Sequence, residues 1–554
     1  MTTAPRVAAE PADDAARPAG PVTAPPDGRS PRTGGSFLAR AALVTAALSV
    51  AGSLLGLVRD QALAHFFGAG TDTDAFLVAW TLPELAATLL IEDGLAFFLV
   101  PAFSLALARR AAEPDADPVR DLVRASLPRM SLWFAGAALL LVAAAPVVVE
   151  LLAPGLPDPG LAVDCTRLTA TCAFTFGLTG YCSAALRAHQ RFVAPATVYV
   201  AYNTAIIAAL FLLAAPFGVR AAAAGVAVGG ALMVLVQAPS LWRQLRRPAD
   251  PAKGPAQAAE TTLQTALIWS VLFFALCRQS QVLVERFLAS SLPAGAISHL
   301  NYAQKVAQMP MALSLMLCTV TFPVVARALA AGETERARDR VERDLVLAGC
   351  MVLLGAAAVI ASAPALIDLL FHRGHFTARD TGITASVMRV YALGLLGHTM
   401  VGALARAHFS VARKTWVPLY AMFVGLVTTA GLGFLTVGAW GVHAIAAANA
   451  AGICVTALLL FRGLGPRTVP VRTKAVLARL ARLTAAAAGA TVLGALTEGA
   501  VGRPALAVLA SGAVVTVSFA LLGLLLKAQP WPSALHSVTR SVTRSVTGEP
   551  RHVR

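Results

Sequence analysis

The sequence predicts an all-α polytopic membrane protein, and its composition is the first of three observations behind that prediction. Hydrophobic residues make up 57% of the 554 residues, and charged residues only 13%, about half the usual share of a soluble domain. The mean hydropathy is +0.69. A soluble enzyme of this length needs more polar surface than this chain supplies, so the composition excludes an ordinary cytosolic enzyme.

The second observation is a series of apolar windows of about 20 residues, the length that crosses a bilayer core as a helix. Fourteen windows follow one another, at 37–58, 74–107, 130–153, 162–186, 194–215, 219–242, 264–285, 298–326, 345–371, 382–405, 417–437, 441–461, 475–497 and 504–526. The second and eighth windows contain Pro83 and Pro310, which predict kinked helices. Residues 1–36 are expected to form a disordered leader rather than a signal peptide, because the first window is long enough to span.

The third observation is the distribution of basic residues between the two sides of the membrane. With the N-terminus in the cytoplasm, the cytoplasmic segments hold 35 of the 45 Lys and Arg residues and the external loops hold 6. This asymmetry supports the number of spans and predicts that both termini are cytoplasmic. The net charge of +16 then reflects membrane topology, and no basic run interleaved with aromatic residues indicates nucleic-acid binding.

A long-range repeat divides the windows into two sets of six. Residues 150–195 and 368–418 both contain an acidic residue with a Leu pair, a short external loop, a span, an Arg and a His, and a helix opening at proline. Six spans separate the copies, which predicts two parallel lobes, at 37–243 and 264–461, that rock about a central cavity. Residues 475–526 are then an appended helix pair, and 527–554 a basic cytoplasmic tail. The alternative is chance similarity between Ala-rich helices.

Candidate functional residues are the ionisable side chains at membrane depth, where a charge is costly. Most of them cluster in windows one, two, seven and eight, which begin the two lobes and can line one cavity. Glu92, Arg278 and Lys305 lie deepest, and we interpret them as functional. Pairing at helix ends for stability alone is the alternative, and it fits Arg59, Asp60, Glu285 and Arg286.

Other polar residues of the spans favour structural roles. Asp164 and Arg167 are three residues apart, which predicts a local ion pair. His398 and His408 are isolated in the sequence. The seven cysteines lie in apolar stretches without a CxxC pair, so we expect no disulfide framework, metal site or cofactor. No ATP-binding motif is present, so transport would draw on an ion gradient, the membrane potential or a substrate gradient.

The chain resembles the lipid II flippases of the MurJ/MviN family, which belong to a superfamily of multidrug, oligosaccharidyl-lipid and polysaccharide exporters. The resemblance rests on GLVRDQALAHFFGAGTDTDAF (56–76), LPELAATLLIEDGLAFFLVP (82–101), HQRFVAPA (189–196), FLASSLPAGAISHLNYAQKVAQMP (287–310) and LLFHRGHFTARD (369–380). It implies a transporter, not an enzyme, that carries a polyprenyl-pyrophosphate-linked sugar-peptide from the inner to the outer leaflet of the bacterial cytoplasmic membrane by alternating access. It also implies that the last two helices form a groove for the lipid tail.

The resemblance also implies which residues bind the substrate. Arg59, Asp74 and Glu92 match charged positions of the family motifs, and Lys305 stands where the family usually has arginine. Arg278 is a further candidate cation of the cavity. In three other places where the family has arginine, this chain has Ser53, Ala87 and Thr88.

Two alternatives remain open from the sequence. One is an exporter of another polyprenyl-linked polysaccharide or amphiphile. The other is a non-transporting scaffold that binds cell-wall synthesis proteins through the leader and the tail. Lys305 favours transport, because a scaffold has no use for a buried lysine.

Overall fold

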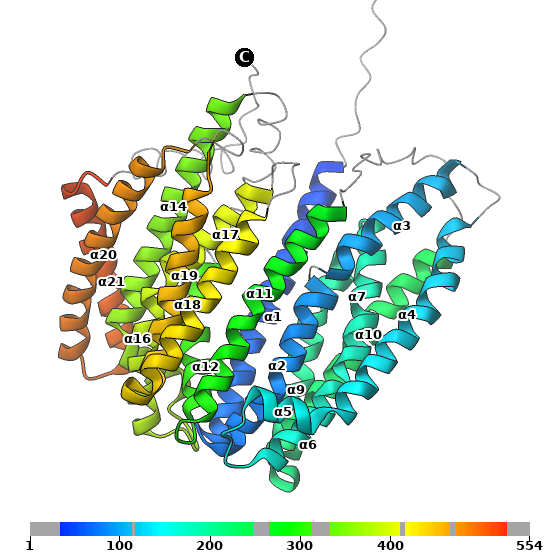
Figure 1. The fold of residues 1–554 in the computed structure, drawn as a ribbon, viewed down its shortest axis with the longest axis horizontal. Coiled ribbons are helices and arrows are strands. Elements are labelled where there is room, and N and C mark those ends of the chain that lie inside the picture. Colours follow the sequence, from blue (N-terminus) through cyan, green and yellow to red (C-terminus); the bar gives the residue numbers. More distant parts are fainter. Residues whose placement is uncertain are drawn as a thin grey trace, which may run out of the picture.

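The computed structural model describes residues 34–92, 94–112, 117–246, 265–312, 314, 333–409, 416–465 and 471–528. Almost all of the predicted leader and of the predicted tail lies outside these residues, and residues 34–36 of the predicted leader belong to the first helix. Every regular element in the described residues is helical, which confirms the all-α prediction. We call the end of the bundle where α1 begins and α21 ends the terminal end, and the other the opposite end (Figure 1).

The N-terminal half of the molecule comprises the helices up to residue 246, and the C-terminal half those from 265 to 462. The first half contains α1 (Gly34–Phe67), α2 (Thr71–Ala86), the π-helix η1 (Ala87–Glu92), α3 (Gly94–Ala112), α4 (Pro118–Ala143), α5 (Ala145–Leu152), α6 (Pro159–Ala170), α7 (Cys172–Ala188), α8 (Val193–Ala196), α9 (Val198–Phe217) and α10 (Arg220–Arg246). The second contains α11 (Thr265–Ser290), α12 (Ala296–Ala307), α14 (Thr334–Ala361), α15 (Ala363–Phe371), α16 (Ala378–Leu393), α17 (Leu395–Phe409), α18 (Val417–Trp440) and α19 (Val442–Arg462). Two more helices follow, α20 (Thr473–Ala500) and α21 (Pro504–Leu525).

The membrane-length helices fall on the predicted windows, but the number of fourteen stays a prediction. Within the described residues, ten helices are long and apolar enough to cross a membrane, and α16 with α17, bent by 43°, makes an eleventh. The remaining windows coincide with α6–α7, α11 and α12. The first of these is interrupted at Thr171, α11 carries three charged residues, and α12 ends at Ala307, shortly before the undescribed residues.

The two predicted proline kinks coincide with irregular helix geometry. Pro83 lies in the last turn of α2, and the chain continues as the π-helix η1 from Ala87. Helix α12 ends at Ala307, three residues before Pro310. A proline removes one helical hydrogen bond and clashes with the preceding turn, which accounts for the end of α12 before Pro310. The π-helix η1 begins after Pro83, so this clash does not explain it.

The two repeated stretches have the same succession of elements. A short helix (α5 or α15) precedes a loop, and the next span is broken in the middle, at Thr171 between α6 and α7 and at Gly394 between α16 and α17. The following helices pack as pairs, α9 with α10 and α18 with α19. The turns within these pairs contain Gly218 (φ +58°) and Gly441 (φ +54°), a backbone conformation that favours glycine.

The predicted local ion pair between Asp164 and Arg167 is wrong. Asp164 instead pairs with Arg220 at the start of α10, with an Nη2–Oδ2 distance of 2.7 Å. Helices α6 and α10 pack against each other, so the guanidinium of Arg220 reaches the carboxylate from a neighbouring helix. Sequence spacing alone identifies only partners on the same helix.

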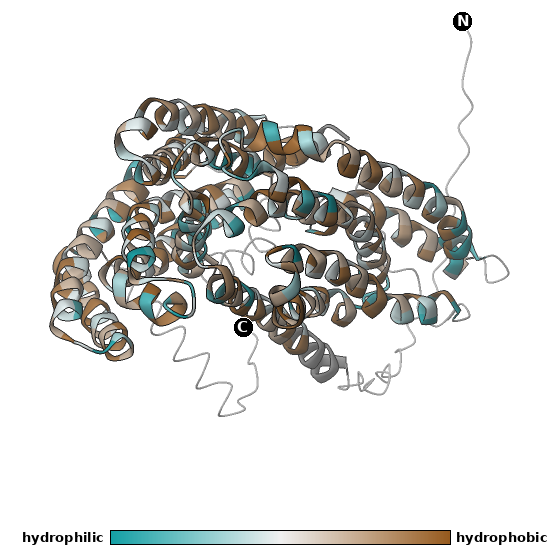
Figure 2. Ribbon diagram, turned by 90° about the horizontal axis from the view of Figure 1, so that it is seen from below, coloured by the Kyte–Doolittle hydropathy of each residue, from teal (hydrophilic) through white to brown (hydrophobic). Residues whose placement is uncertain are grey.

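The appended pair α20–α21 packs on the C-terminal half, chiefly on α14 and α15 (Figure 1). Most of its buried side chains are small or aliphatic, among them Leu480, Leu483 and Val515, and Phe519 is a buried aromatic residue of α21. Arg472, just before α20, binds Glu342 of α14 through Nη2 at 2.9 Å. Hydrophobic residues predominate along the helices in the view along the bundle, as expected for membrane helices (Figure 2).

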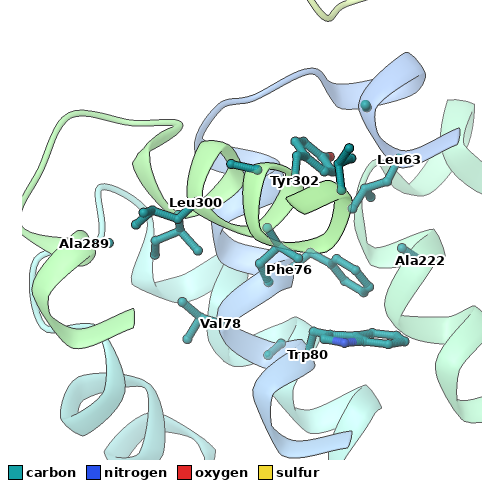
Figure 3. Packing of buried hydrophobic residues seen from close by; sticks show 14 of the residues in the cluster. Leu63, Phe76, Val78, Trp80, Ala222, Ala289, Leu300 and Tyr302 are labelled. Carbon is teal, nitrogen blue, oxygen red and sulfur yellow. The ribbon is translucent and has the colours of Figure 1, made fainter. Parts of the chain in front are cut away.

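The largest buried core joins the two halves near the opposite end. Phe76, Val78 and Trp80 of α2 pack beside Leu300 and Tyr302 of α12 (Figure 3). Phe76 and Tyr302 are 2% and 0% exposed. This core fixes α1, α2, α11 and α12 relative to one another, and these are the helices that carry the candidate functional residues.

Candidate functional site: charged side chains where the two halves meet

A cluster of acidic and basic side chains joins the two halves where α1, α2 and α12 meet. Near the end of α1, Arg59 donates from Nε and Nη2 to Oδ1 of Asp60, at 3.0 and 2.7 Å. The other oxygen of Asp60 lies 3.3 Å from Nζ of Lys305, on α12. Asp60 is therefore shared by one cation from each half, and we call these three residues the charged triad.

Aromatic and amide groups hold the charged triad in place. The guanidinium of Arg59 lies 4.3 Å from the ring centroid of Trp80, and Nζ of Lys305 lies 5.8 Å from it. Both distances are within the range of cation–π attraction. Asn203 on α9 accepts from Nη1 of Arg59 at 3.1 Å and donates to the backbone oxygen of Gly52 at 3.1 Å. Arg59 is thus fixed on several sides, whereas Lys305 is held mainly by Asp60.

The exposures within the charged triad show which cation can reach a ligand. The side chains of Arg59 and Asp60 are 10% and 6% exposed, and that of Lys305 is 29% exposed. An ammonium group has three donors, and Asp60 uses one of them. Glu84 on α2 is close enough to interact electrostatically with Lys305. The arrangement therefore presents a cation that is partly free to bind an anionic oxygen.

Asp74 connects the two halves at the opposite end. Its oxygens accept from the backbone N–H groups of Gly295 and Ser298, both at 2.7 Å, and from the Ser298 hydroxyl at 2.5 Å. These donors lie at the start of α12, so the carboxylate of α2 caps a helix of the other half. Asp74 is 3% exposed, so it stabilises the contact between the halves and is not accessible to a substrate in this state.

Backbone contacts close the opposite end around Asp74. The N–H of His375 donates to the carbonyl oxygen of His65 at 3.0 Å, which links the loop after α15 to the last turn of α1. A Cβ on Gly374 would lie 2.2 Å from that oxygen, and one on Gly68 would lie 2.5 Å from the carbonyl oxygen of His375. Only glycine permits so close an approach, and the two halves are in backbone contact here.

A second polar cluster lies inside the C-terminal half. Glu285 of α11 is 3% exposed and accepts from Tyr391 Oη at 2.9 Å and from Asn449 Nδ2 at 2.5 Å. Asn449 Oδ1 in turn lies 3.1 Å from Nε2 of His398. His398 was expected to be isolated, but it belongs to this hydrogen-bonded chain. The neighbouring Arg286 turns the other way, toward α12.

The structure places three of the five candidate residues where the two halves meet. Arg59 and Lys305 belong to the charged triad, and Asp74 joins the two halves separately, at the start of α12. Glu92 is exposed and accepts a hydrogen bond from Tyr199 at 2.8 Å, one π-helical segment beyond α2. Arg278 is exposed on α11, two turns from Glu285. These last two residues do not contact the charged triad.

Several residues of the two clusters make contacts that the sequence did not predict. Asp60 was interpreted as a helix-end partner of Arg59, and the 2.7 Å contact confirms that pairing, but Asp60 also binds Lys305. Glu285 and Arg286 were grouped in the same way, although they point to different neighbours. Trp80 and Asn203 were not singled out. The lone tryptophan and asparagine in otherwise apolar spans were the available signals.

The fold and the site define a class. A helical bundle with many membrane-length helices, repeated halves and a charged contact between them is a membrane transporter of the multi-helix exporter type.

Comparisons with known proteins then identify the family. The family model described as Lipid II flippase MurJ matches residues 63–504, and the chain belongs to this family. It is 28% identical over 446 residues to the Lipid II flippase MurJ of Burkholderia cenocepacia, covering 78% of this chain and 84% of the relative. It is 26% identical over 472 residues to the Probable lipid II flippase MurJ of Bdellovibrio bacteriovorus, covering 82% and 87%.

Solved structures support the fold. A structure of Lipid II flippase MurJ in an inward closed conformation matches with a TM-score of 0.69 at 17% identity, covering 88% of this chain and 99% of that one. An inward-facing multidrug resistance MATE family transporter of the MOP superfamily matches with a TM-score of 0.59 at 14% identity, covering 79% and 99%. At these identities the likeness shows the fold alone.

Proposed function

We propose that this protein moves lipid II, the lipid-linked peptidoglycan precursor, from the inner to the outer leaflet of the bacterial cytoplasmic membrane. The observation that carries the proposal is the charged triad, in a chain of the lipid II flippase family. Lys305 bridges the two halves through Asp60 and still keeps 29% of its side chain exposed. A cation in this position can bind an anionic head group, and that binding would alter the Lys305–Asp60 contact that joins the two halves.

The pyrophosphate of the substrate would compete with Asp60 for the two cations of the triad. Arg59 offers a planar, forked set of donors, and Lys305 offers a mobile point charge. Both cations now contact the carboxylate of Asp60, so a bound pyrophosphate would replace Asp60 as their acceptor. Asp74 would hold the nearby start of α12, while Glu92 and Arg278 would face the substrate farther toward the terminal end.

Alternating access would follow from rocking the lobe at 37–243 against the lobe at 264–461. The backbone contacts at His65 and His375 close the opposite end. With both termini in the cytoplasm, this end faces outward, so the described state is closed to the outside. The basic segments at the terminal end support that orientation.

The appended helices would keep the polyprenyl tail in lipid while the head crosses. Helices α20 and α21 expose large aliphatic side chains such as Leu496, Leu509 and Leu525, each more than half exposed. Each methylene drawn into water costs about 0.8 kcal/mol, so a long tail must remain in an apolar environment. Residues 475–526 therefore serve as the lipid-facing side of the transport path.

A second candidate substrate is another polyprenyl-linked saccharide. Ser53, Ala87 and Thr88 stand where the family resemblance implies arginine, and this reduces the positive charge available to a head group. Thr88 instead donates to the backbone oxygen of Glu84 at 3.3 Å.

Complementation distinguishes these substrates. The native flippase is depleted in a bacterium that expresses this chain, and growth and lipid II accumulation are measured. Restored growth is the result we expect. Normal membrane levels of the protein without growth would exclude lipid II and favour the second substrate or a non-transporting role.

A further inference from the structure

Glu84 of α2 is a partly exposed acid beside the charged triad. It follows Trp80 by four residues, so the two side chains lie on the same face of the helix. Trp80 lies against both cations of the triad, with its ring centroid 4.3 Å from the guanidinium of Arg59 and 5.8 Å from Nζ of Lys305. Glu84 is therefore one helical turn from the triad, on the side toward the terminal end.

The electrostatic neighbours of Glu84 come from both halves. Glu84 acts electrostatically on Lys305 of α12 and on Glu285 of α11, which belong to the C-terminal half. In its own half it acts on Tyr202 of α9, whose ring centroid lies 5.8 Å from that of Trp80. The carboxylate of Glu84 thus lies where the halves meet, near the cation that we assign to the substrate.

The carboxylate of Glu84 makes no hydrogen bond or ion pair with any residue that the structure describes. The hydroxyl of Thr88 donates to the backbone oxygen of Glu84 and not to its side chain. Asp60, by contrast, is paired with Lys305, and Glu92 accepts a hydrogen bond from Tyr199. A carboxylate offers about four acceptor positions, so Glu84 can accept hydrogen bonds from a ligand.

The six ionisable residues that we assign to the transport path divide equally between the two signs. Three are basic and three are acidic, namely Arg59, Arg278 and Lys305, and Asp60, Glu84 and Glu92. A path with balanced charges attracts a purely anionic ligand less strongly than a path lined by cations only. The contact of such a ligand with Glu84 would also be repulsive, which disfavours it relative to a ligand that carries both signs.

We propose that Glu84 binds an ammonium group of the substrate while the pyrophosphate binds Arg59 and Lys305, so that the site selects a zwitterionic head group. The inference rests on the proposed function and names the class of substrate more closely. A peptide with a side-chain amine supplies such a group, because a flexible peptide can fold back and bring the amine toward the pyrophosphate. A polyprenyl-linked polysaccharide without amines does not supply it.

The ammonium group would also offset negative charge that accumulates when the head group binds. A pyrophosphate that replaces Asp60 as the acceptor of the two cations leaves the carboxylates of Asp60 and Glu84 near it. Unpaired charges are costly away from water, and an ammonium at Glu84 forms charge-assisted hydrogen bonds there. Glu84 therefore favours enclosure of a substrate with an amine over one without.

Binding of two matched analogues tests the pairing without requiring transport. The purified full-length protein in detergent is titrated with a fluorescent lipid II analogue whose peptide has a free side-chain amine, and with the same analogue after acetylation of that amine. Acetylation removes the positive charge. We expect the wild type to bind the free amine about tenfold more tightly. In Glu84→Gln the ratio of the two dissociation constants should fall to about one.

A control and a structural alternative sharpen this experiment. Glu150 is an exposed acid of α5, and Glu150→Gln should keep the tenfold ratio. If Glu84 only balances the charge of Lys305, Glu84→Gln would change both affinities by the same factor and leave the ratio at its wild-type value. That result would overturn the proposal, and so would a wild-type ratio of about one.

Flipping of the same two analogues in proteoliposomes separates this inference from the proposed function. We expect the wild type to flip the free-amine analogue faster than the acetylated one, and Glu84→Gln to flip both at one rate. If the wild type flips both analogues equally fast, the transport function stands and the role of Glu84 is overturned. If the wild type flips neither, the proposed function is overturned, and the assignment of Glu84 to a substrate site is overturned with it.

Discussion

The first helix of each half carries an adjacent acid and base near the opposite end, and the two halves use them differently. In α1 the order is Arg59–Asp60, and the acid faces Lys305 of the other half. In α11 the order is Glu285–Arg286, and the acid faces α16 and α19 of its own half. One residue on a helix corresponds to a rotation of about 100°. The reversed order therefore turns one acid toward the interface and the other away from it.

This difference places the two acids in different environments. Asp60 is paired with two cations, one from each half. Glu285 accepts hydrogen bonds from uncharged donors of its own half. The repeated fold thus puts one acid in the contact between the halves and the other inside one half. Substitutions at these positions test whether the two acids have separate roles.

The largest effect is expected from removing the helix pair that only the C-terminal half carries. A chain ending before residue 470 lacks α20 and α21 but keeps both halves. The newly exposed face of α14 is apolar and tolerates lipid, so the core should fold. We expect this variant to lose flipping of long-chain lipid II analogues in proteoliposomes. A truncated protein with the full rate would show that the pair is only an anchor.

The next largest effect concerns the stability of the two acid clusters. Asp60→Asn leaves Arg59 and Lys305 without their shared carboxylate, and a broken buried ion pair costs about 3–5 kcal/mol. Glu285→Gln removes a charge that has only uncharged partners, so its cost should be about 1 kcal/mol or less. Thermal unfolding in detergent measures both, with Glu150→Gln as the control. Equal destabilisation by the two substitutions would contradict the comparison.

A smaller effect on the contact between the halves is expected where Asp74 caps the start of α12. Asp74→Asn keeps the shape of the side chain but loses one acceptor and the charge that face the start of α12. Loss of such a hydrogen bond costs about 1–3 kcal/mol, so the opposite end should open more often. Thr73 is buried at this end, so faster reaction of a Thr73→Cys variant with an impermeant maleimide would show this opening. An unchanged rate would mean that Asp74 does not hold the two halves together.

The last effect is confined to the closed end and comes from a single methyl group. Gly374→Ala places a Cβ against the carbonyl oxygen of His65, at a backbone φ of +63°. The strained conformation alone costs about 1 kcal/mol. Gly382→Ala, where a Cβ would meet nothing within 4 Å, is the control. We expect Gly374→Ala, but not Gly382→Ala, to raise maleimide labelling of the Thr73→Cys variant.

The sequence was sufficient to predict the class of fold because hydropathy and charge asymmetry act over whole helices. It also identified Lys305, since a lysine in an apolar window is costly wherever it points. It could not show that Asp60 and Lys305 touch, because they are far apart along the chain. Nor could it separate Glu285 from Asp60, because their difference is one of rotation about the helix axis. The Asp164–Arg220 pair was missed for the same reason, since its residues lie on different helices.

The most direct test of the central claim is the flipping rate of Lys305 variants in proteoliposomes loaded with a fluorescent lipid II analogue. Lys305→Ala removes the partly exposed cation that bridges the halves, and we expect the rate to fall to that of protein-free vesicles. Lys305→Arg keeps the charge and should retain most of the rate. Both variants should reach the membrane at normal levels. A Lys305→Ala protein that flips at the wild-type rate would contradict the assignment of the charged triad as the substrate site.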